Sequence, residues 1–287
     1  MGKRKVGLVL EGGAMRGMYT AGVLDGLMDH GVRVDGILGV SAGACFGCNL
    51  FSGQRGRVLR YNMRFMGDPR NVGIRSLLTT GDIVNREFAY HVIPTQYDVF
   101  DEAAFEAYGG EYRVVVTNVD TGEAEYMQMH DLFRDIEMMR ASASMPFCSN
   151  MVEIEGKKYL DGGIADSIPV RAAMELGYDR LIVVLTQPAD YRKRPMNRAL
   201  IKAFYRDYPN LCRTLMNRHA NYNAQAEDVA HLEREGRVFV IRPKEALHIK
   251  RLEKNPKELA RVHAVGLADV EEAMERLKRY LREGDGA

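Results

Sequence analysis

The sequence predicts an α/β protein of three layers, in which a mainly parallel central sheet carries helices on both faces. Two observations support this class. A short apolar run at 5–10 precedes apolar residues at helical spacing from 16 to 30, and the same order returns at 36–40 and 41–51. Strands that alternate with helices pair in parallel, and such sheets are covered on both faces. The first two strands should therefore end at the same edge, where such sheets bind ligands.

Local patterns predict the later elements in turn. Paired strands are expected at 112–118 and 123–129, and a hairpin at 151–160 turns at Gly156. Further helices are expected at 55–66, 101–108, 131–143, 170–176 and 255–282, and further strands at 181–186 and 238–241. We expect residues 1–190 to form a core and 191–287 a mostly helical C-terminal extension, which packs on the core and returns the strand 238–241. One structural domain is the simplest organisation.

Composition argues against several classes of protein. The 287 residues carry a formal net charge of +1, so the molecule lacks the strong positive field of a nucleic-acid-binding protein. No segment holds the roughly 18 consecutive apolar residues of a transmembrane helix. The apolar run at 6–10 is too short for a secretory signal, so we expect a cytoplasmic location.

Two of the four cysteines, Cys45 and Cys48, form a C-x-x-C, a spacing found in redox pairs and in half of a zinc site. No second ligand pair is spaced to complete such a site, and reduced cysteine packs as a small hydrophobe. We therefore interpret both cysteines as packing residues, and we expect neither a metal nor a cofactor.

The segment Gly39-Val40-Ser41-Ala42-Gly43 has the G-x-S-x-G form of a nucleophile elbow. In that motif a strand turns sharply into a helix and exposes a serine hydroxyl. Gly39 and Gly43 lack Cβ atoms where the two backbones crowd together. The alternative is that Ser41 merely caps the helix.

A glycine-rich turn, Glu11–Gly17, stands between the first strand and the first helix. A dinucleotide-binding loop would need a glycine where Ala14 stands. We interpret the N–H groups of Gly12, Gly13 and Ala14 as donors to an oxyanion. Arg16 either holds this loop or meets an anionic substrate.

A third motif, Asp161-Gly162-Gly163, follows the predicted hairpin and offers a carboxylate base. Alone, Asp-Gly-Gly is an ordinary turn, and Asp166 is a competing carboxylate. The interpretation of Asp161 as a base depends on this motif following the other two in the sequence.

Together the three motifs resemble those of the patatin-like phospholipases, a family of lipid acyl hydrolases, over roughly residues 5–190. The resemblance, closest to bacterial members, implies that 1–190 is a catalytic core and that Asp161 activates Ser41 directly, without a histidine. It also implies an acyl-enzyme, a phospholipid or lysophospholipid substrate and no calcium requirement. The oxyanion and substrate-binding loop of the family falls on Gly12, Gly13, Ala14, Arg16 and Gly17. Glu11 and Ala14 depart from the Asp and Gly usual there.

Two alternatives remain. An α/β-hydrolase would need a Ser–Asp–His triad, for which chain order offers His219, His231, His248 and His263, although none follows a clear strand. A non-catalytic member of the family would bind lipid without turnover.

Two stretches are locally basic, with six arginines against one acid at 55–75 and eight Lys or Arg against one acid at 191–223. In the second stretch, apolar residues predicted to share one helix face are Leu200, Phe204, Tyr208, Leu211 and Leu215. This stripe either faces the core or forms a docking surface for an anionic membrane.

Overall fold

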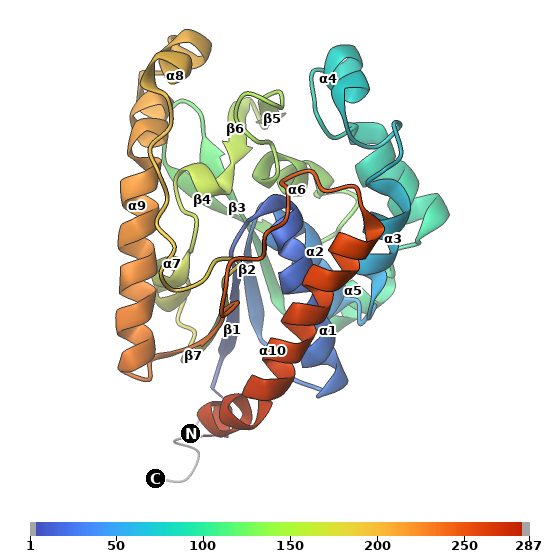
Figure 1. The fold of residues 1–287 in the computed structure, drawn as a ribbon, viewed down its shortest axis with the longest axis vertical. Helices are drawn as coiled ribbons and strands as arrows, with labels where there is room; N and C mark the ends of the chain where they lie inside the picture. The colour runs from blue at the N-terminus through green and yellow to red at the C-terminus, as the bar shows by residue number, and fades with distance from the viewer. Residues whose placement is uncertain (1–3, 283–287) are drawn as a thin grey trace.

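The computed structural model describes residues 4–282, and within this range an eight-stranded sheet forms the centre of the molecule (Figure 1). Its strands are β1 (Val6–Leu10), β2 (Gly36–Val40), β3 (Glu111–Asn118), β4 (Ala124–Met129), β5 (Val152–Ile154), β6 (Lys157–Asp161), β7 (Arg180–Val184) and β8 (Val238–Ile241). Hydrogen-bonded neighbours follow the path β5-β6-β3-β2-β1-β7-β8, and β4 pairs with β3 off this path. The run from β3 to β8 is parallel, whereas β4, β5 and β6 join in antiparallel pairs.

The α-helices are α1 (Gly17–Asp29), α2 (Ala42–Phe51), α3 (Arg57–Phe65), α4 (Ile74–Thr80), α5 (Glu102–Tyr108), α6 (Ile136–Ser142), α7 (Val170–Glu175), α8 (Arg198–Tyr205), α9 (Pro209–Arg234) and α10 (Pro256–Arg282). Two short 3-10 helices, η1 (Ala14–Arg16) and η3 (Gly162–Ile164), and a π-helix, η2 (Phe88–Tyr97), complete the set in residues 4–282. The sequence did not predict α4 or η2, and η2 contains Pro94, which ordinarily breaks a helix.

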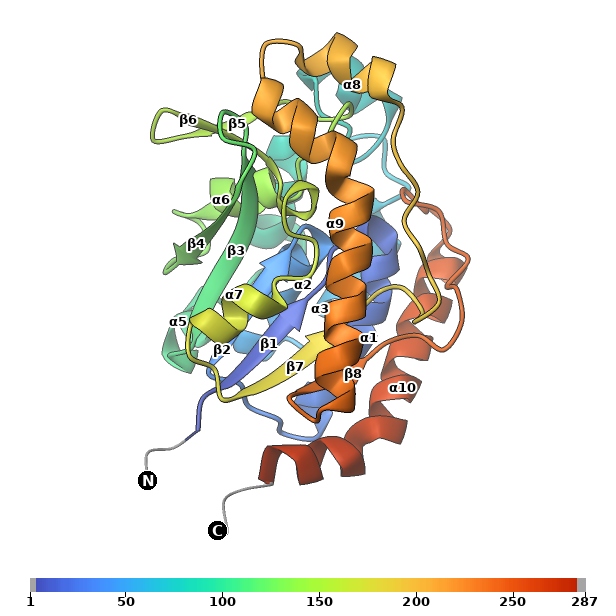
Figure 2. The same cartoon turned by 90° about the vertical axis from the view of Figure 1, so that its left-hand side faces the viewer.

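Alternate side chains of the central strands enter different helical layers. Leu8 and Leu10 of β1 belong to the same hydrophobic cluster as residues of α1, α2 and α10. Val9 points to the opposite face and packs with residues of α7 and α9 (Figure 2). A strand with apolar side chains on both faces is what a sheet between two helical layers requires. The three-layer α/β prediction is confirmed.

The last part of the chain returns to the sheet and to its first helix. β8 pairs in parallel with β7, and α10 lies along α1. A Cβ on Gly266 would lie 2.0 Å from the carbonyl oxygen of Tyr19, so only glycine permits this close approach of the two helices. The strand expected at 238–241 and the helix expected at 255–282 are both present.

The apolar stripe expected over 200–215 is not continuous. The helical conformation breaks at 206–208, and Pro209 opens α9. Leu211 and Leu215 are buried, but Leu200 and Phe204 on α8 are 44% and 59% exposed. The prediction of one helix face was therefore wrong, because spacing alone does not reveal the break.

Among helices of residues 4–282, none combines the length and apolar character needed to cross a bilayer.

Candidate active site

Ser41 and Asp161 meet because two strands approach each other end to end along one edge of β3. Val40, the last residue of β2, pairs with Val115, and Asp161, the last residue of β6, pairs with Val116. β2 runs parallel to β3 and β6 antiparallel, so their carboxyl ends face each other there. The hydroxyl Oγ of Ser41 donates a hydrogen bond of 2.8 Å to Oδ2 of Asp161, across 120 residues of sequence.

The backbone at Ser41 has the sharp turn that the elbow motif predicts. Its φ of 53° and ψ of −120° lie where a residue with a Cβ is disfavoured, at a cost of about 1–3 kcal/mol. A Cβ on Gly43 would lie 2.5 Å from the carbonyl oxygen of Leu10, so glycine is needed for α2 to start this close to β1. Gly39 lies in β2, beside the backbone of Ala44.

The segment at the end of α6 holds both buried side chains in place. The Ser41 N–H donates to Oγ of Ser142 at 2.8 Å, and the Asp161 N–H donates to the carbonyl of Ser144 at 2.9 Å. The Gly163 N–H donates to the other carboxylate oxygen of Asp161 at 2.8 Å. The sequence analysis assigned no role to Ser142 or Ser144.

Asp166, the competing carboxylate, makes other contacts. It accepts hydrogen bonds from Tyr126 at 2.7 Å and from Gln225 at 2.8 Å, and burial raises its pKa. The candidate base next to Ser41 is Asp161.

The glycine-rich turn lies against the serine. A Cβ on Gly12 would be 2.9 Å from Cβ of Ser41, and Ala14 has a positive φ of 48°. No hydrogen bond joins the N–H of Gly12, Gly13 or Ala14 to another residue of 4–282. Gly17 opens α1 against α2.

Glu11 anchors this turn to the far side of the sheet. Its carboxylate accepts hydrogen bonds from the Thr186 N–H at 2.6 Å and from the Tyr222 hydroxyl at 2.8 Å. Thr186 also donates to the carbonyl of Gly12 at 3.0 Å. The departure at position 11 thus ties the loop to the end of β7 and to α9.

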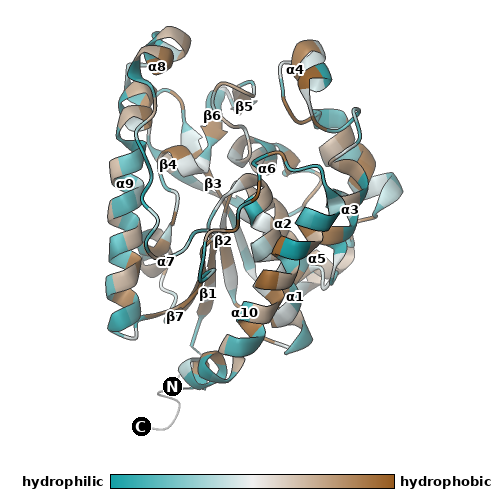
Figure 3. Cartoon of the chain, in the orientation of Figure 1, coloured by the Kyte–Doolittle hydropathy of each residue, from teal (hydrophilic) through white to brown (hydrophobic). Residues whose placement is uncertain are grey.

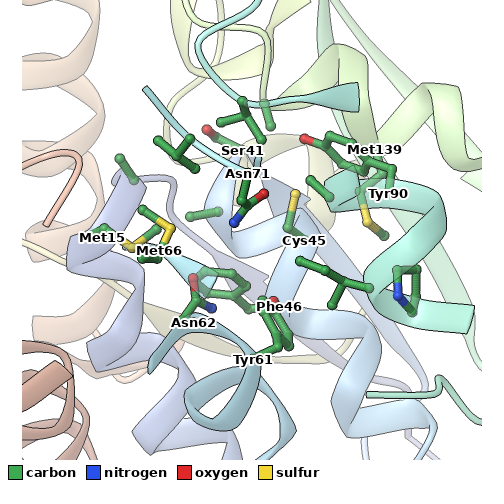
Figure 4. A pocket seen from close by; sticks show the side chains of 18 of the residues that line it. Met15, Ser41, Cys45, Phe46, Tyr61, Asn62, Met66, Asn71, Tyr90 and Met139 are labelled. Carbon is green, nitrogen blue, oxygen red and sulfur yellow. The ribbon is translucent and has the colours of Figure 1, made fainter. Parts of the chain in front are cut away.

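An apolar cavity of about 180 Å³ opens beside Ser41, toward α2, α3 and η2 (Figure 4). Larger side chains that line it include Met15, Phe46, Tyr61, Met66, Tyr90 and Met139. Cys45 and Cys48 also line it as free thiols, and burial raises the pKa of each to about 12. The thiols are therefore protonated, which agrees with their interpretation as packing residues.

Cationic side chains lie on the α9 side of the pair. Nε of Arg218 donates to the carbonyl of Gly163 at 2.6 Å. Lys193, in the segment between β7 and α8, is partly buried, and its pKa is lowered to about 7, chiefly by burial and then by Arg218. Nε of Arg16 is buried without a hydrogen-bond partner. Sequence reasoning missed Lys193 and Arg218, which it counted only as members of the basic stretch.

One acidic cluster in residues 4–282 has the spacing of a metal site. Carboxylate oxygens of Glu102, Glu106 and Asp131 lie within 4.8 Å of one another. None of the three lines the cavity beside Ser41. The cluster is therefore separate from the candidate active site.

Comparison with known proteins matches two family models to this chain. The Patatin-like phospholipase family matches residues 8–174, more than half of the chain, and a domain of unknown function (DUF6363) matches 208–282. The uncharacterized protein YjjU of Escherichia coli is 29% identical over 85% of this chain and 70% of its own length. Lysophospholipase NTE1 of Scheffersomyces stipitis is 30% identical over 67% of this chain, which spans only 12% of that protein.

A crystal structure of VipD from Legionella pneumophila aligns with 96% of this chain and 67% of that chain, with a TM-score of 0.48 and 14% identity. The assignment rests instead on the family match, which contains all of the Glu11–Gly17 turn, the Ser41 elbow and the Asp161 motif. The chain belongs to the patatin-like phospholipase family.

Proposed function

We propose that this protein is a serine acyl hydrolase that cleaves fatty-acyl esters of phospholipids or lysophospholipids through a Ser41–Asp161 dyad. The observation that carries the proposal is the 2.8 Å hydrogen bond from Ser41 to Asp161, beside an apolar cavity. A nucleophile within hydrogen-bond reach of its base is the geometry that nucleophilic catalysis needs. The family and a relative named as a lysophospholipase support a lipid ester as the substrate.

In this mechanism Asp161 accepts the proton of Ser41 Oγ while that oxygen attacks the ester carbonyl. The tetrahedral intermediate collapses, the bond to the alcohol breaks, and the alcohol leaves with the proton from Asp161. Water then attacks the acyl-enzyme, with Asp161 again as base, and the fatty acid is released. The Gly163 N–H fixes the carboxylate through its other oxygen, so the base stays oriented through both steps.

The Gly12–Ala14 loop is the proposed oxyanion hole. Three consecutive N–H groups without a partner among the described residues, next to the nucleophile, are available to the developing oxyanion. Losing one such donor costs about 10²–10³ in rate. Glu11 acts outside the chemistry, because hydrogen bonds from Thr186 and Tyr222 occupy its carboxylate.

The contacts of the histidines favour a dyad over a triad. His263 pairs with Asp25 at 2.8 Å, and His231 lies 3.1 Å from Glu235. Within residues 4–282 no histidine hydrogen-bonds to Ser41 or Asp161. A triad enzyme would need one of them as its base.

We also propose that α4 and α8 dock on an anionic membrane. Both helices stand at the end of the molecule where the parallel strands finish, and both carry apolar residues (Figure 3). Ile74 and Leu78 of α4 are 73% and 80% exposed, and Leu200 and Phe204 of α8 are also exposed. Basic residues on or beside α8 without a carboxylate partner in the described chain are Arg194, Arg198, Lys202 and Arg213. Exposed apolar tips among cations fit anionic headgroups.

Vesicle binding tests this surface. Leu78→Glu and Phe204→Glu should each weaken binding to phosphatidylglycerol vesicles, and salt should weaken it further. Val99→Glu is the matched control, because Val99 is 60% exposed between η2 and α5. Equal binding to phosphatidylcholine and phosphatidylglycerol would contradict the proposal.

We propose, finally, that the core 1–190 and the extension 191–287 act as one domain, since β8 extends the sheet and α10 packs on α1. Residues 1–3 and 283–287 of these ranges lie outside the described residues. Expression of 1–190 alone, which would expose apolar surface of α1, should yield insoluble protein.

Hydrolysis of p-nitrophenyl octanoate tests the main proposal. Ser41→Ala and Asp161→Asn should each lose about a thousandfold or more in kcat/KM, because one removes the nucleophile and the other its base. Asp166→Asn should keep most activity, and so should the wild type in EDTA. A fluorophosphonate probe should label the wild type but not Ser41→Ala. Turnover by Ser41→Ala would exclude the dyad, and an unlabelled wild type would favour a non-catalytic protein.

A further inference from the structure

The side of the dyad that faces α9 holds cations without carboxylate partners. No hydrogen bond or ion pair joins the guanidinium of Arg16 or the ammonium of Lys193 to any residue of 4–282. Among the described residues, the guanidinium of Arg218 hydrogen-bonds only to the carbonyl of Gly163. By contrast, the arginines of the other basic stretch are largely paired: Arg55 with Asp29, Arg57 and Arg60 with Asp98, and Arg70 with Asp68.

Arg218 lies near the candidate base, on the other side of Gly163. Its Nη2 is 3.4 Å from the point where a Cβ on Gly163 would stand, and the same point is 3.1 Å from Oδ1 of Asp161. Nε is fixed by the Gly163 carbonyl, so the Nη atoms remain for a further acceptor. A guanidinium held in this way can bind two oxygens of one anion.

Lys193 is held over α9 by its backbone and by an aromatic ring. Its N–H donates to the side chain of Asn223 at 2.8 Å, and the Asn223 amide returns a bond of 3.2 Å to its carbonyl. The ammonium lies 3.9 Å from the ring centroid of Tyr222, whose hydroxyl bonds Glu11. These contacts fix the position of the ammonium. It lies next to Tyr222, whose hydrogen bond to Glu11 holds the glycine-rich turn.

Within residues 4–282, neither Glu11 nor Asp161 forms an ion pair or hydrogen bond with these three cations, although both lie close enough to attract them. Thr186 and Tyr222 occupy Glu11, while Ser41 and Gly163 occupy Asp161. Burial lowers the pKa of Arg218; nearby Asp161 offsets part of this effect, whereas Arg251 and Arg16 add to it. Burying cations without a partner is costly. An anionic ligand would relieve that cost.

We propose that Arg16, Lys193 and Arg218 form a subsite for the phosphate group of the substrate, with the C-terminal extension supplying two of its three cations. The inference rests on the proposed function. The fatty-acyl chain would enter the apolar cavity on one side of Ser41, and the phosphate would lie on the α9 side. The substrate class is then an acyl ester of glycerol that carries a phosphate, and inorganic phosphate shares the same chemistry.

A pair of soluble substrates tests this subsite without a membrane. Octanoylglycerol and octanoyl lysophosphatidylglycerol, both below their micellar concentrations, carry the same ester and differ by the charged phosphodiester. Lys193→Gln should lower the ratio of kcat/KM, charged over neutral, by about tenfold, mainly by raising KM, as expected for one lost charge-assisted contact. Lys257→Gln, at an exposed position of α10, should leave the ratio within about twofold of the wild type.

Calorimetric titration with inorganic phosphate supplies a readout that needs no turnover. Saturable binding that weakens about tenfold in Lys193→Gln, but not in Lys257→Gln, would support the subsite. No saturable binding to the wild type, or equal binding to Lys193→Gln, would overturn it. Phosphate binding that depends on Lys193, with an unchanged substrate ratio, would overturn the headgroup assignment and leave a site for free phosphate.

Failure of the proposed function has a different signature. A wild type that hydrolyses neither octanoyl ester nor p-nitrophenyl octanoate removes the hydrolase, whereas the phosphate titration still decides the subsite. An active wild type without preference for the charged substrate overturns the subsite alone. Thermal unfolding of Lys193→Gln tests whether the variant is folded. Arg218→Lys keeps the positive charge but not the two-pronged guanidinium, so it should lose part of the preference for the charged substrate.

Discussion

The two sides of the Ser41–Asp161 pair differ in both chemistry and origin. Toward α2, α3 and η2 the lining is largely apolar and comes mostly from residues 14–145, within the family-matched region. Toward α9 the groups are cationic, and Lys193 and Arg218 lie beyond that region. A low-polarity cavity suits an acyl chain, whereas unpaired cations suit an anion. Under the proposed function, the acyl chain would contact mostly the family-matched region, whereas two of the three cations for the headgroup would come from the extension.

The largest loss of activity is expected from changing a residue on which both sides of the Ser41–Asp161 pair depend. Gly43→Ala places a Cβ 2.5 Å from the Leu10 carbonyl, and backbone cannot move aside cheaply. We expect about a hundredfold loss of turnover on charged and neutral substrates alike, and about 1–3 kcal/mol of lost stability. Gly67→Ala is the control, because the nearest atom to its Cβ would be 3.9 Å away. Loss confined to one substrate would show that the sides do not share the elbow.

Filling the cavity should affect the apolar side alone. Ala89→Phe puts a ring into the space that Ala89 lines beside Ser41. Activity on dodecanoyl esters should fall about tenfold to a hundredfold relative to acetyl esters, since a pocket discriminates by the length it can hold. Ala103→Phe, on the exposed part of α5, should leave the chain-length profile intact. Equal loss on all chain lengths would place the acyl group elsewhere.

Removing the hydrogen bond between α9 and the glycine-rich turn should lower the stability of the protein. Tyr222→Phe leaves buried Glu11 without one of its donors. A hydrogen bond to a charged group contributes about 1.5–3 kcal/mol, so unfolding should become easier by that amount. Chemical denaturation measures it, with Tyr191→Phe as the aromatic control. Unchanged stability would mean that Glu11 does not depend on α9.

The pH dependence of KM should distinguish the cationic side of the pair from the apolar side. The pKa of Lys193 is lowered to about 7, so its positive charge is lost as the pH rises from about 6 to 8. KM for octanoyl lysophosphatidylglycerol should rise by up to about tenfold over that interval, and Lys193→Gln should abolish the dependence. The other charged or titratable groups around Lys193 are Glu11, Arg16, Asp161, Tyr191, Arg218 and Tyr222. An identical pH profile for octanoylglycerol would assign the effect to catalysis instead.

The same shift has a consequence for stability. Because the folded-state pKa lies below the ordinary 10.5, the unfolded chain binds more protons between about pH 7 and 10.5. Stability contributed through Lys193 should therefore rise with pH across this window, and Lys193→Gln should flatten the rise. A steeper rise in the variant would contradict the assignment.

The smallest expected effect lies at Ala14, in the glycine-rich turn at the edge of the apolar cavity. Its φ of 48° suits glycine better than alanine, so Ala14→Gly should stabilise the protein by about 1 kcal/mol, or roughly 2 °C in Tm. Differential scanning calorimetry resolves such a change. A fall in Tm would show that the lost unfolded-state restriction outweighs the relieved backbone.

The sequence predicted most of the fold and named Ser41 and Asp161 as candidates, but it did not predict the contacts that hold them together. The elbow and the strand–helix alternation are local patterns, so Ser41 could be placed on its turn. The end-to-end meeting of β2 and β6 is a long-range pairing with β3 that no local pattern encodes. Lys193 and Arg218 were missed because a cation facing a site has the same sequence signature as one facing water. The break before Pro209 was missed because apolar spacing continued across it.

The end-to-end arrangement of β2 and β6 also makes β3 a template for assembly. Ser41 and Asp161 come together only after both strands have paired with β3, over a long separation in sequence. Such non-local pairings form late in folding, because the entropy of closing the long loops must be overcome first. Under the proposed mechanism, a chain still emerging from the ribosome, with β2 made and β6 not yet made, would therefore have a nucleophile but no base, and would stay inactive until the sheet is complete.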